Sequence, residues 1–302
     1  MELKKYLILV VGPTGVGKTE LCLNLAKIFD TEIISCDSRQ FFRETNLGTA
    51  KPSPSELAQV KHHFINNLSI HDGYDVKAFE RDAMVLLAQL FKNHDKIIMT
   101  GGSGLYVDAI CNGFDDIPEI DPSVRKLIIE QYEKEGIVFL QTEVEEHDPV
   151  YYGVVDRQNP QRLMRALEVI RGTGRAYSSF RNKKKTKRPF EIIKIGLELD
   201  REELYGRIDL RMDMMIDAGL FEEAETLYPY RKLNALQTVG YTEIFGYLDG
   251  DYDRDEAVRL LKRNSRRYAK RQLTWFRRDT EIEWFDPKQQ EDIYQFIKNQ
   301  IG

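Results

Sequence analysis

Cysteine is scarce in this chain, and its cysteines are not grouped. The sequence has only three in 302 residues, at Cys22, Cys36 and Cys111. They form no C-x-x-C pair and have no histidine at the spacing of a metal site. We therefore expect three reduced thiols that pack as small core residues, and no zinc site.

Long apolar runs are also missing, since no stretch reaches the length that crosses a membrane. The chain opens MELKKYLILVV and enters an apolar segment directly, without the h-region and cleavage site of a secretory signal. These absences predict a cytoplasmic protein with no membrane segment. With 302 residues and 42% hydrophobic composition, the chain can bury a large core, as one domain with an insertion or as two domains.

The formal net charge of −5 argues against nucleic acid as a partner, but the charges are segregated along the chain. Residues 115–156 carry 12 acidic and 3 basic side chains, whereas residues 259–278 carry 9 basic and no acidic ones. The basic segment also contains Tyr268, Trp275 and Phe276, a composition typical of nucleic-acid-binding surfaces. On composition alone, a solvated helix face explains the segment equally well.

The most informative stretch is LILVVGPTGVGKTELCLNLA, residues 7–26. It reads as an apolar strand, a glycine-rich turn and an amphipathic helix. The turn fits G-x-x-x-x-G-K-[ST], in which amides at a helix N-terminus and a lysine hold phosphate, and the final hydroxyl binds Mg²⁺. We predict a magnesium ligand in Thr19 and phosphate contacts along the whole loop, from Gly12, Pro13, Thr14, Gly15, Val16, Gly17, Lys18 and Thr19.

The first half of the chain alternates strands and helices, which predicts a parallel sheet flanked by helices. The expected strands are 7–11, 31–37 and 95–102. Ligands of such sheets lie beyond the carboxyl ends of the strands. Asp37 and Ser103 follow two of those ends, so we expect both near the phosphate loop.

A helical pattern without strand alternation replaces this order from about residue 113, and strand character returns at 190–200. The sequence therefore predicts an α/β fold of the P-loop type, a parallel sheet with flanking helices. Its catalytic core comprises residues 1–114 and 190–302 with C-terminal helices, and residues 115–189 form a helical insertion domain.

Three activities fit a phosphate loop: a nucleotide or nucleoside kinase, an RNA-binding NTPase, and a transferase whose donor carries a diphosphate. Kinases and NTPases usually need an acidic metal ligand at the end of an apolar strand, and the strand at 95–102 offers none. Asp200 ends the later strand, but a helical pattern follows it at once. We therefore expect Asp200 to be a helix N-cap.

Eight motifs occur in the order found in bacterial tRNA dimethylallyltransferases, and the chain resembles this family over nearly its whole length. The resemblance implies transfer of a dimethylallyl group from dimethylallyl diphosphate to N6 of the adenosine 3′ to the anticodon, in tRNAs reading codons that begin with U. A P-loop nucleotide or nucleoside kinase is the alternative. The motifs are GPTGVGKT (12–19), SCDSRQ (35–40), LGTAKP (47–52), GGSGLY (101–106), NPQRLMRALEV (159–169), LYGRIDLRMDMMIDAGL (204–220), TVGYTE (238–243) and AKRQLTWFR (269–277).

The resemblance also implies catalytic roles. Asp37 matches the family's catalytic aspartate, which removes a proton from the adenine amine; a role beside Mg²⁺ is the alternative for this carboxylate. Ser103 matches a hydroxyl near the bridging oxygen of the donor. The loop and Mg²⁺ on Thr19 stabilise the departing diphosphate.

Two arginines four residues apart, Arg207 and Arg211, share one face of a predicted helix. We expect them to reach the same diphosphate. The alternative is a surface ion pair with Asp209 or Glu203.

The resemblance further implies that tRNA binds through its anticodon stem-loop and that the target adenine leaves its stack. The protein is expected to be a monomer. His62 and His63 are expected to be structural. The expected tRNA contacts are Asp37, Ser38, Arg39, Gln40, Ser103, Arg125, Gln161, Arg162, Leu163, Met164 and Arg165.

Overall fold

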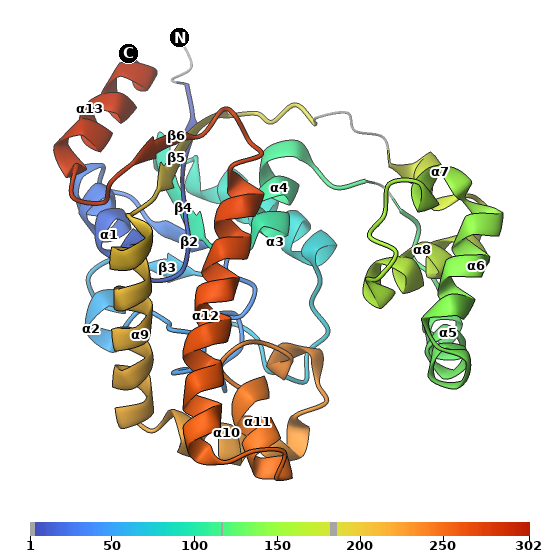
Figure 1. The fold of residues 1–302 in the computed structure, drawn as a ribbon. Coiled ribbons are helices and arrows are strands. Elements are labelled where there is room, and N and C mark those ends of the chain that lie inside the picture. The colour runs from blue at the N-terminus through green and yellow to red at the C-terminus, as the bar shows by residue number, and fades with distance from the viewer. Residues whose placement is uncertain (1–3, 116, 182–185) are drawn as a thin grey trace. The chain divides into compact units, whose positions relative to one another are not determined.

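The computed structural model describes residues 4–115, 117–181 and 186–302. The chain divides into two compact units, Met1–Cys111 with Lys187–Gly302 and Asn112–Thr186. Both are drawn in Figure 1. The predicted insertion has the bounds 115–189, and the observed smaller unit has the bounds 112–186.

The larger unit is built on a six-stranded parallel sheet in the order β3-β2-β4-β1-β5-β6. The four predicted strands are confirmed as β1, β2, β4 and β5. Two further strands are too short to give a periodic signal in the sequence. The bounds are β1 Tyr6–Val11, β2 Ile33–Ser35, β3 His62–His63, β4 Lys96–Gly101, β5 Glu191–Leu197 and β6 Glu283–Phe285.

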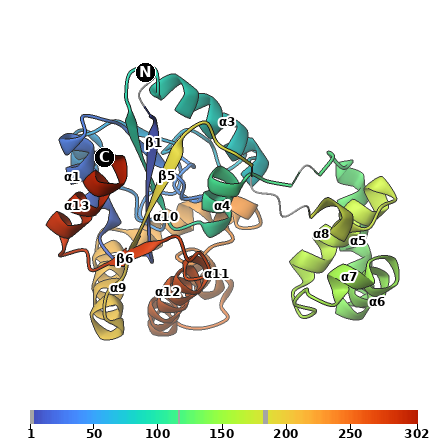
Figure 2. The ribbon, with the colours of Figure 1, turned by 90° about the horizontal axis from the view of Figure 1, so that it is seen from above.

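Helices cover both faces of this sheet. Alternate residues of β1 enter different cores: Ile8 and Val10 pack with α1 and α13, whereas Leu7 and Leu9 pack with α3 and α4. Figure 2 shows the two pairs of helices on opposite sides of β1 and β5. The helices of this unit are α1 (Lys18–Ile28), α2 (Pro54–Leu57), α3 (Val76–Leu90), α4 (Gly104–Asn112), α9 (Arg201–Asp217), α10 (Leu220–Leu227), α11 (Thr242–Asp249), α12 (Arg254–Phe276) and α13 (Gln290–Ile301), with 3₁₀ turns η2 (Tyr228–Tyr230) and η3 (Asn234–Leu236).

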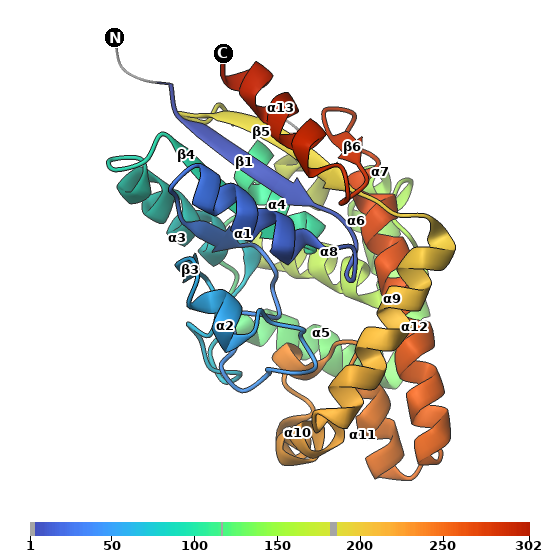
Figure 3. The same ribbon diagram turned by 90° about the vertical axis from the view of Figure 1, so that its left-hand side faces the viewer.

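Helices α9 and α12 run side by side away from the carboxyl edge of the sheet, and α10 and α11 pack at their far ends (Figures 1 and 3). Asp200 caps α9 by accepting a hydrogen bond from the Glu202 N–H at 2.8 Å, as predicted. A separate apolar core, with Leu236, Tyr241 and Leu261 fully buried, holds this helical lobe together.

The smaller unit is helical, and its described residues include no strand. Its core centres on Ile128, Leu140, Val144 and Leu167, all fully buried. Its helices are α5 (Pro122–Glu135), α6 (Ile137–His147), α7 (Pro149–Tyr152) and α8 (Pro160–Thr173), with the 3₁₀ turn η1 (Tyr177–Phe180).

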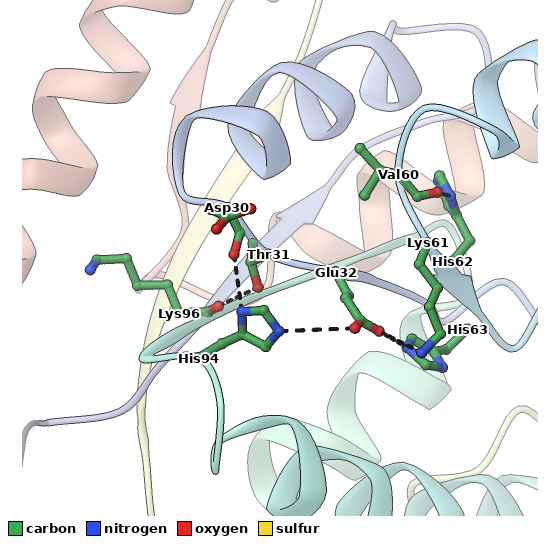
Figure 4. A network of polar contacts seen from close by, with 9 residues as sticks. All are labelled: Asp30, Thr31, Glu32, Val60, Lys61, His62, His63, His94 and Lys96. Atoms are coloured by element: carbon green, nitrogen blue, oxygen red, sulfur yellow. Dashed lines mark hydrogen bonds and ion pairs between the residues drawn. The ribbon is translucent and has the colours of Figure 1, made fainter.

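A polar network surrounds Glu32 at the amino ends of β2 and β4, the edge of the sheet away from the phosphate loop (Figure 4). His63 Nε2 lies 2.5 Å and Lys61 Nζ 3.2 Å from Glu32 Oε2, and His94 Nε2 lies 3.9 Å from Oε1. His94 also hydrogen-bonds the Asp30 carbonyl at 3.0 Å. These contacts tie β2, β3 and β4 together, which fits the structural role expected for His63.

The predicted states of the cysteines are confirmed, because all three are free and buried. Over residues 4–115, 117–181 and 186–302, no helix combines the length and apolar character needed to cross a membrane.

Candidate active site

The phosphate loop joins β1 to α1, and its glycines are required by geometry. Gly12 has φ +145°, and a Cβ there would lie 2.6 Å from the Leu197 carbonyl oxygen. Gly17, with φ +109°, precedes the first helical residue. The Val16 side chain is fully buried in the core, so only its backbone can face a ligand. The loop therefore presents amides at a helix N-terminus, where anions bind.

Lys18 folds back over this loop. Its ammonium donates to the carbonyl oxygens of Gly12 at 2.9 Å and Pro13 at 2.8 Å. Removal from water lowers the pKa of Lys18 to about 8, although the Asp37 carboxylate opposes the shift. An ammonium has three N–H donors, so one stays available to an anion.

A cavity of about 430 Å³ opens in front of the loop. Its walls contain the predicted catalytic residue Asp37 and seven of the predicted donor-site residues, which are Thr14, Gly15, Gly17, Lys18, Thr19, Arg207 and Arg211. Contributions come from the P-loop, the end of β2 and helix α9. This is the edge at which parallel sheets bind ligands.

A second cavity, of about 70 Å³, meets the first. Its own walls include Arg39, Thr238 and Tyr268. Asp37 lies in the shared wall, and a carboxylate there can be reached from both sides. The residues that line both cavities are Thr14, Asp37, Thr49, Ala50 and Arg211.

Desolvation raises the pKa of Asp37. A hydrogen bond from the Arg39 N–H to Oδ1 at 3.1 Å and the charges of Lys18, Arg39 and Arg211 oppose this effect without cancelling it. A carboxylate of raised pKa is a stronger base, which suits proton abstraction.

Ser103 lies beside the loop that follows β2. Its Oγ accepts a hydrogen bond from the Ser38 N–H at 3.0 Å and lies 3.0 Å from Ser38 Oγ. The structure therefore brings Ser103, Ser38 and Asp37 into one cluster.

Arg207 and Arg211 of α9 do not make the ion pairs that were the alternative for them, because those carboxylates have other partners. Asp209 pairs with Arg266 at 2.5 Å, and Glu203 pairs with Lys288 at 3.0 Å. Arg211 instead donates to Thr14 Oγ1. The Arg207 guanidinium lies beside the loop, 3.6 Å from where a Cβ of Gly17 would stand.

Arg39 and Gln40 point to different cavities. Arg39 donates to the carbonyl oxygens of Asn234 at 2.6 Å and Gln237 at 3.3 Å, and it lines the smaller cavity. Gln40 lines the larger one, the side of the phosphate loop, where its amide is 3.4 Å from the Ala50 carbonyl oxygen.

In the smaller unit, Arg125 and Arg165 converge on one largely buried carboxylate. Arg125 lies 2.8 Å and Arg165 3.1 Å from Glu168, and Arg125 also donates to Gln161 at 3.0 Å. Arg162, which lies on α8 with Arg165 and Glu168, is exposed.

The expectation of tRNA contacts from Leu163 and Met164 needs correction. Their relative exposures are 0% and 3%, and both pack in the core of the smaller unit. A helix that shows one face to a ligand must bury the other, and these two residues lie on the buried face. Their side chains are structural in this conformation.

The basic segment lies on α12, and its cations differ in their surroundings. Arg266 is held by Asp209 at 2.5 Å. In contrast, Arg267, Lys270 and Arg271 are exposed. Arg259 and Arg277 are exposed as well but pair with Glu256 and Glu198, and Arg278 lies beyond the end of α12. We therefore take Arg267, Lys270 and Arg271 as the exposed basic group of α12.

Gln272 is a site residue that the sequence analysis missed. It is 5% exposed, and its amide bonds both the phosphate loop and the backbone before Ser103. A signal was available, because Gln272 shares helical spacing with Ala269 and Phe276 on the apolar stripe of α12. A polar residue in such a stripe needs a buried partner.

Comparisons with known proteins show the family to which the chain belongs. The sequence model of the IPP transferase family matches residues 40–279. The tRNA dimethylallyltransferase 1 of Bacteroides fragilis is 50% identical over 98% of this chain and 99% of its own length.

Solved structures show the same relationship. The full-length tRNA isopentenylpyrophosphate transferase of Bacillus halodurans matches with a TM-score of 0.73 and 36% identity, covering 99% of this chain and 97% of that one. A eukaryotic dimethylallyltransferase acting on tRNA matches with a TM-score of 0.80 and 25% identity, covering 98% and 80%. With a family model that spans most of its length and a half-identical relative of nearly equal extent, this chain belongs to the IPP transferase family.

Proposed function

We propose that this protein transfers a dimethylallyl group from dimethylallyl diphosphate to N6 of the adenosine 3′ to the anticodon, in tRNAs reading codons that begin with U. The observation that carries the proposal is the pair of cavities that meet at Asp37. Such a site can receive a donor from one side and a nucleobase from the other. The names of the relatives support a transferase over a kinase. We also propose that the enzyme acts in the cytoplasm as a monomer.

The diphosphate of the donor would lie in the larger cavity, against the loop amides, Lys18, Arg207 and Arg211. Breaking the allylic carbon–oxygen bond places negative charge on the departing diphosphate. Cations fixed at that point therefore stabilise the transition state more than the ground state. Ser103 would donate its hydroxyl near the bridging oxygen.

The chain's residues fit Mg²⁺ bound with the diphosphate. No described group of three or more His, Cys, Asp or Glu side chains could hold a metal alone, as expected for an ion that is shared with phosphate oxygens. Thr19 lines the cavity. Thr100 lies in the same wall. Mg²⁺ there would neutralise charge on the leaving group, with Thr19 as its protein ligand.

Asp37 would act as the general base. The lone pair of an adenine amine is delocalised into the ring, so the nitrogen attacks efficiently only if a proton leaves as the bond forms. The raised pKa of Asp37 favours this role. Its position between the cavities lets it reach the amine while Lys18 and Arg211 face the diphosphate.

The adenine would enter through the smaller cavity after leaving its stack in the anticodon loop. Arg39 and Tyr268 line that entrance, and Ser38 and Ser103 lie beside Asp37. Gln40 would contact the donor side, where its amide faces the larger cavity.

The tRNA backbone would contact two cationic surfaces, one in each unit. On α12 we propose Arg267, Lys270 and Arg271, which are exposed. In the smaller unit we propose Arg125, Gln161, Arg162 and Arg165, of which Arg125 and Arg165 also pair with Glu168. The buried residues Leu163 and Met164 are left out.

The deciding experiment combines purified protein, tRNA, labelled dimethylallyl diphosphate and Mg²⁺, with no nucleotide. We expect label in the tRNA at the adenosine 3′ to the anticodon. ATP-dependent phosphoryl transfer without a prenylated tRNA would overturn the proposal in favour of a kinase.

A further inference from the structure

Helix α12 sends one buried amide into the candidate active site. Gln272 Oε1 accepts a hydrogen bond from the Thr14 N–H at 2.8 Å, and Nε2 donates to the Gly102 carbonyl oxygen at 2.9 Å. The first partner belongs to the phosphate loop, and the second precedes Ser103. An amide supplies both an acceptor and donors. One side chain can therefore bond an N–H of the first loop and a carbonyl oxygen of the second.

Close packing fixes the amide against the second loop. A Cβ at position 102 would lie 2.0 Å from Gln272 Nε2, and one at position 104 would lie 2.3 Å from Trp275. Two glycines therefore let α12 rest directly on the backbone that flanks Ser103. The Ser103 hydroxyl in turn bonds Ser38, next to Asp37.

The first loop is restrained from a second direction. Thr14 Oγ1 accepts from Arg211 of α9 while the Thr14 N–H donates to Gln272 of α12. Thr14 lines both cavities. Its amide is thus committed to the protein, as is the Val16 N–H, which donates to the Pro13 carbonyl oxygen at 3.4 Å.

We propose that Gln272 is a positioning residue that sets the distance between the phosphate loop and the Ser103–Asp37 cluster. The inference rests on the proposed prenyl transfer, because only there must the donor carbon, the base and the leaving diphosphate align. Misplacement of reacting groups by about 1 Å can cost about 100-fold in rate. Gln272 lines the larger cavity, but both of its hydrogen bonds go to the two loops, and we assign its effect to their spacing.

The test compares Gln272→Leu and Gln272→Glu with wild type, and uses Thr274→Ala, an exposed change on the same helix, as the control. We expect Gln272→Leu to lower the single-turnover rate at saturating tRNA and dimethylallyl diphosphate by about 10- to 100-fold. Affinity for inorganic diphosphate, measured by titration calorimetry, should stay close to that of wild type. The control should match wild type in both.

Gln272→Glu gives a second, pH-dependent readout. A neutral carboxyl group has one donor and acceptors, like the amide, whereas a carboxylate cannot donate to Gly102. Burial raises the pKa of a carboxyl group. The rate of this variant, divided by the wild-type rate at each pH, should therefore rise as the pH is lowered from about 8 to about 6. The same ratio for Gln272→Leu should not change with pH.

A near-wild-type rate in both variants would overturn the proposal. The proposal would also be overturned, in favour of a purely structural role, if both variants lost diphosphate affinity and melting temperature together with rate and the rate of Gln272→Glu did not recover at low pH. Failure of the proposed function would look different, since wild type itself would then form no prenylated tRNA.

Discussion

The two edges of the sheet differ in whether the protein compensates the charges of their side chains. At the carboxyl edge, desolvation lowers the pKa of Lys18 and raises that of Asp37, so both groups are displaced toward their neutral forms. At the amino edge, burial alone would raise the pKa of Glu32, but hydrogen bonds from His63 and Lys61 outweigh it, and that pKa is lowered.

The difference separates function from stability. The charge of Glu32 is satisfied inside the protein and strengthens the junction of three strands. Lys18 and Asp37 stay incompletely compensated, and in the proposed function their remaining partners are ligands. Perturbed groups that face a cavity are characteristic of functional sites, and the same sheet therefore holds a reactive edge and a structural edge.

Removing the base at the reactive edge should have the largest effect. Asp37→Asn keeps size and some hydrogen bonding, but we expect the saturated single-turnover rate to fall by about 10²- to 10⁴-fold. Dissociation constants for tRNA and diphosphate should change little. Glu32→Gln, which makes the same change at the other edge, should leave the rate unaltered.

A near-normal rate for Asp37→Asn would exclude this carboxylate from the mechanism. Weakened donor binding that extra Mg²⁺ partly restores would instead assign Asp37 to the metal.

The second prediction concerns Lys18. Lys18→Met removes a charged hydrogen bond to diphosphate worth about 1.5–3 kcal/mol, which corresponds to about 10- to 100-fold in affinity. In wild type, a bound anion should raise the pKa of Lys18 above its free-state value of about 8. Diphosphate affinity should then be fully present below that pH and fall as the pH rises through it.

Calorimetric titrations with diphosphate at several pH values check this pH dependence. Lys18→Met should remove the fall in affinity above the free-state pKa of Lys18. Lys61→Met, at the amino edge, should keep that fall. A wild-type affinity that is independent of pH in this range would contradict the free-state shift of Lys18.

The third prediction tests whether the exposed cations of α12 bind RNA. Changing Arg267, Lys270 and Arg271 to glutamine should weaken tRNA binding and reduce the slope of log affinity against log salt by about 0.7 to 0.9 per lost phosphate contact. Diphosphate affinity should stay as in wild type. Arg266→Gln, a charge already held by Asp209, should change the slope less. An unaltered slope in the triple variant would make this segment a solvated face.

Much of the reactive edge is local in sequence and could be predicted. The phosphate loop needs its glycines, Lys18 and Thr19 at fixed spacing, and strand ends placed Asp37 and Ser103 near it. The cap at Asp200 was equally local. The alternation of strands and helices in the first half of the chain predicted the parallel sheet.

Contacts between distant segments escaped prediction. Arg266 of the basic segment is held by Asp209, which lies 57 residues earlier in the chain, and nothing in the local sequence indicates this partner. Gln272 bonds Thr14 across 258 positions, and nothing local indicates that partner. Leu163 and Met164 belong to the motif NPQRLMRALEV, from which tRNA contacts were expected. Only the packing of α8 shows that their side chains point into the core of the smaller unit. Strand β3 has two residues, too few for any periodicity.

The smallest expected effect lies at the structural edge, and it should appear in stability rather than in rate. The folded-state pKa of Glu32 is lowered, so its contribution is present above the unfolded pKa of about 4.3 and is lost as the pH falls through the folded value. The Glu32 side chain is 22% exposed, and solvent screens the pair, so Glu32→Gln should reduce the free energy of unfolding at neutral pH by less than about 1 kcal/mol. Urea denaturation should show that difference near pH 7, and the difference should disappear once the pH is below the lowered folded-state pKa. A loss that persists in acid would mean that the glutamine disturbs packing around His63, and a loss of single-turnover rate in this variant would show that the two edges are not separate.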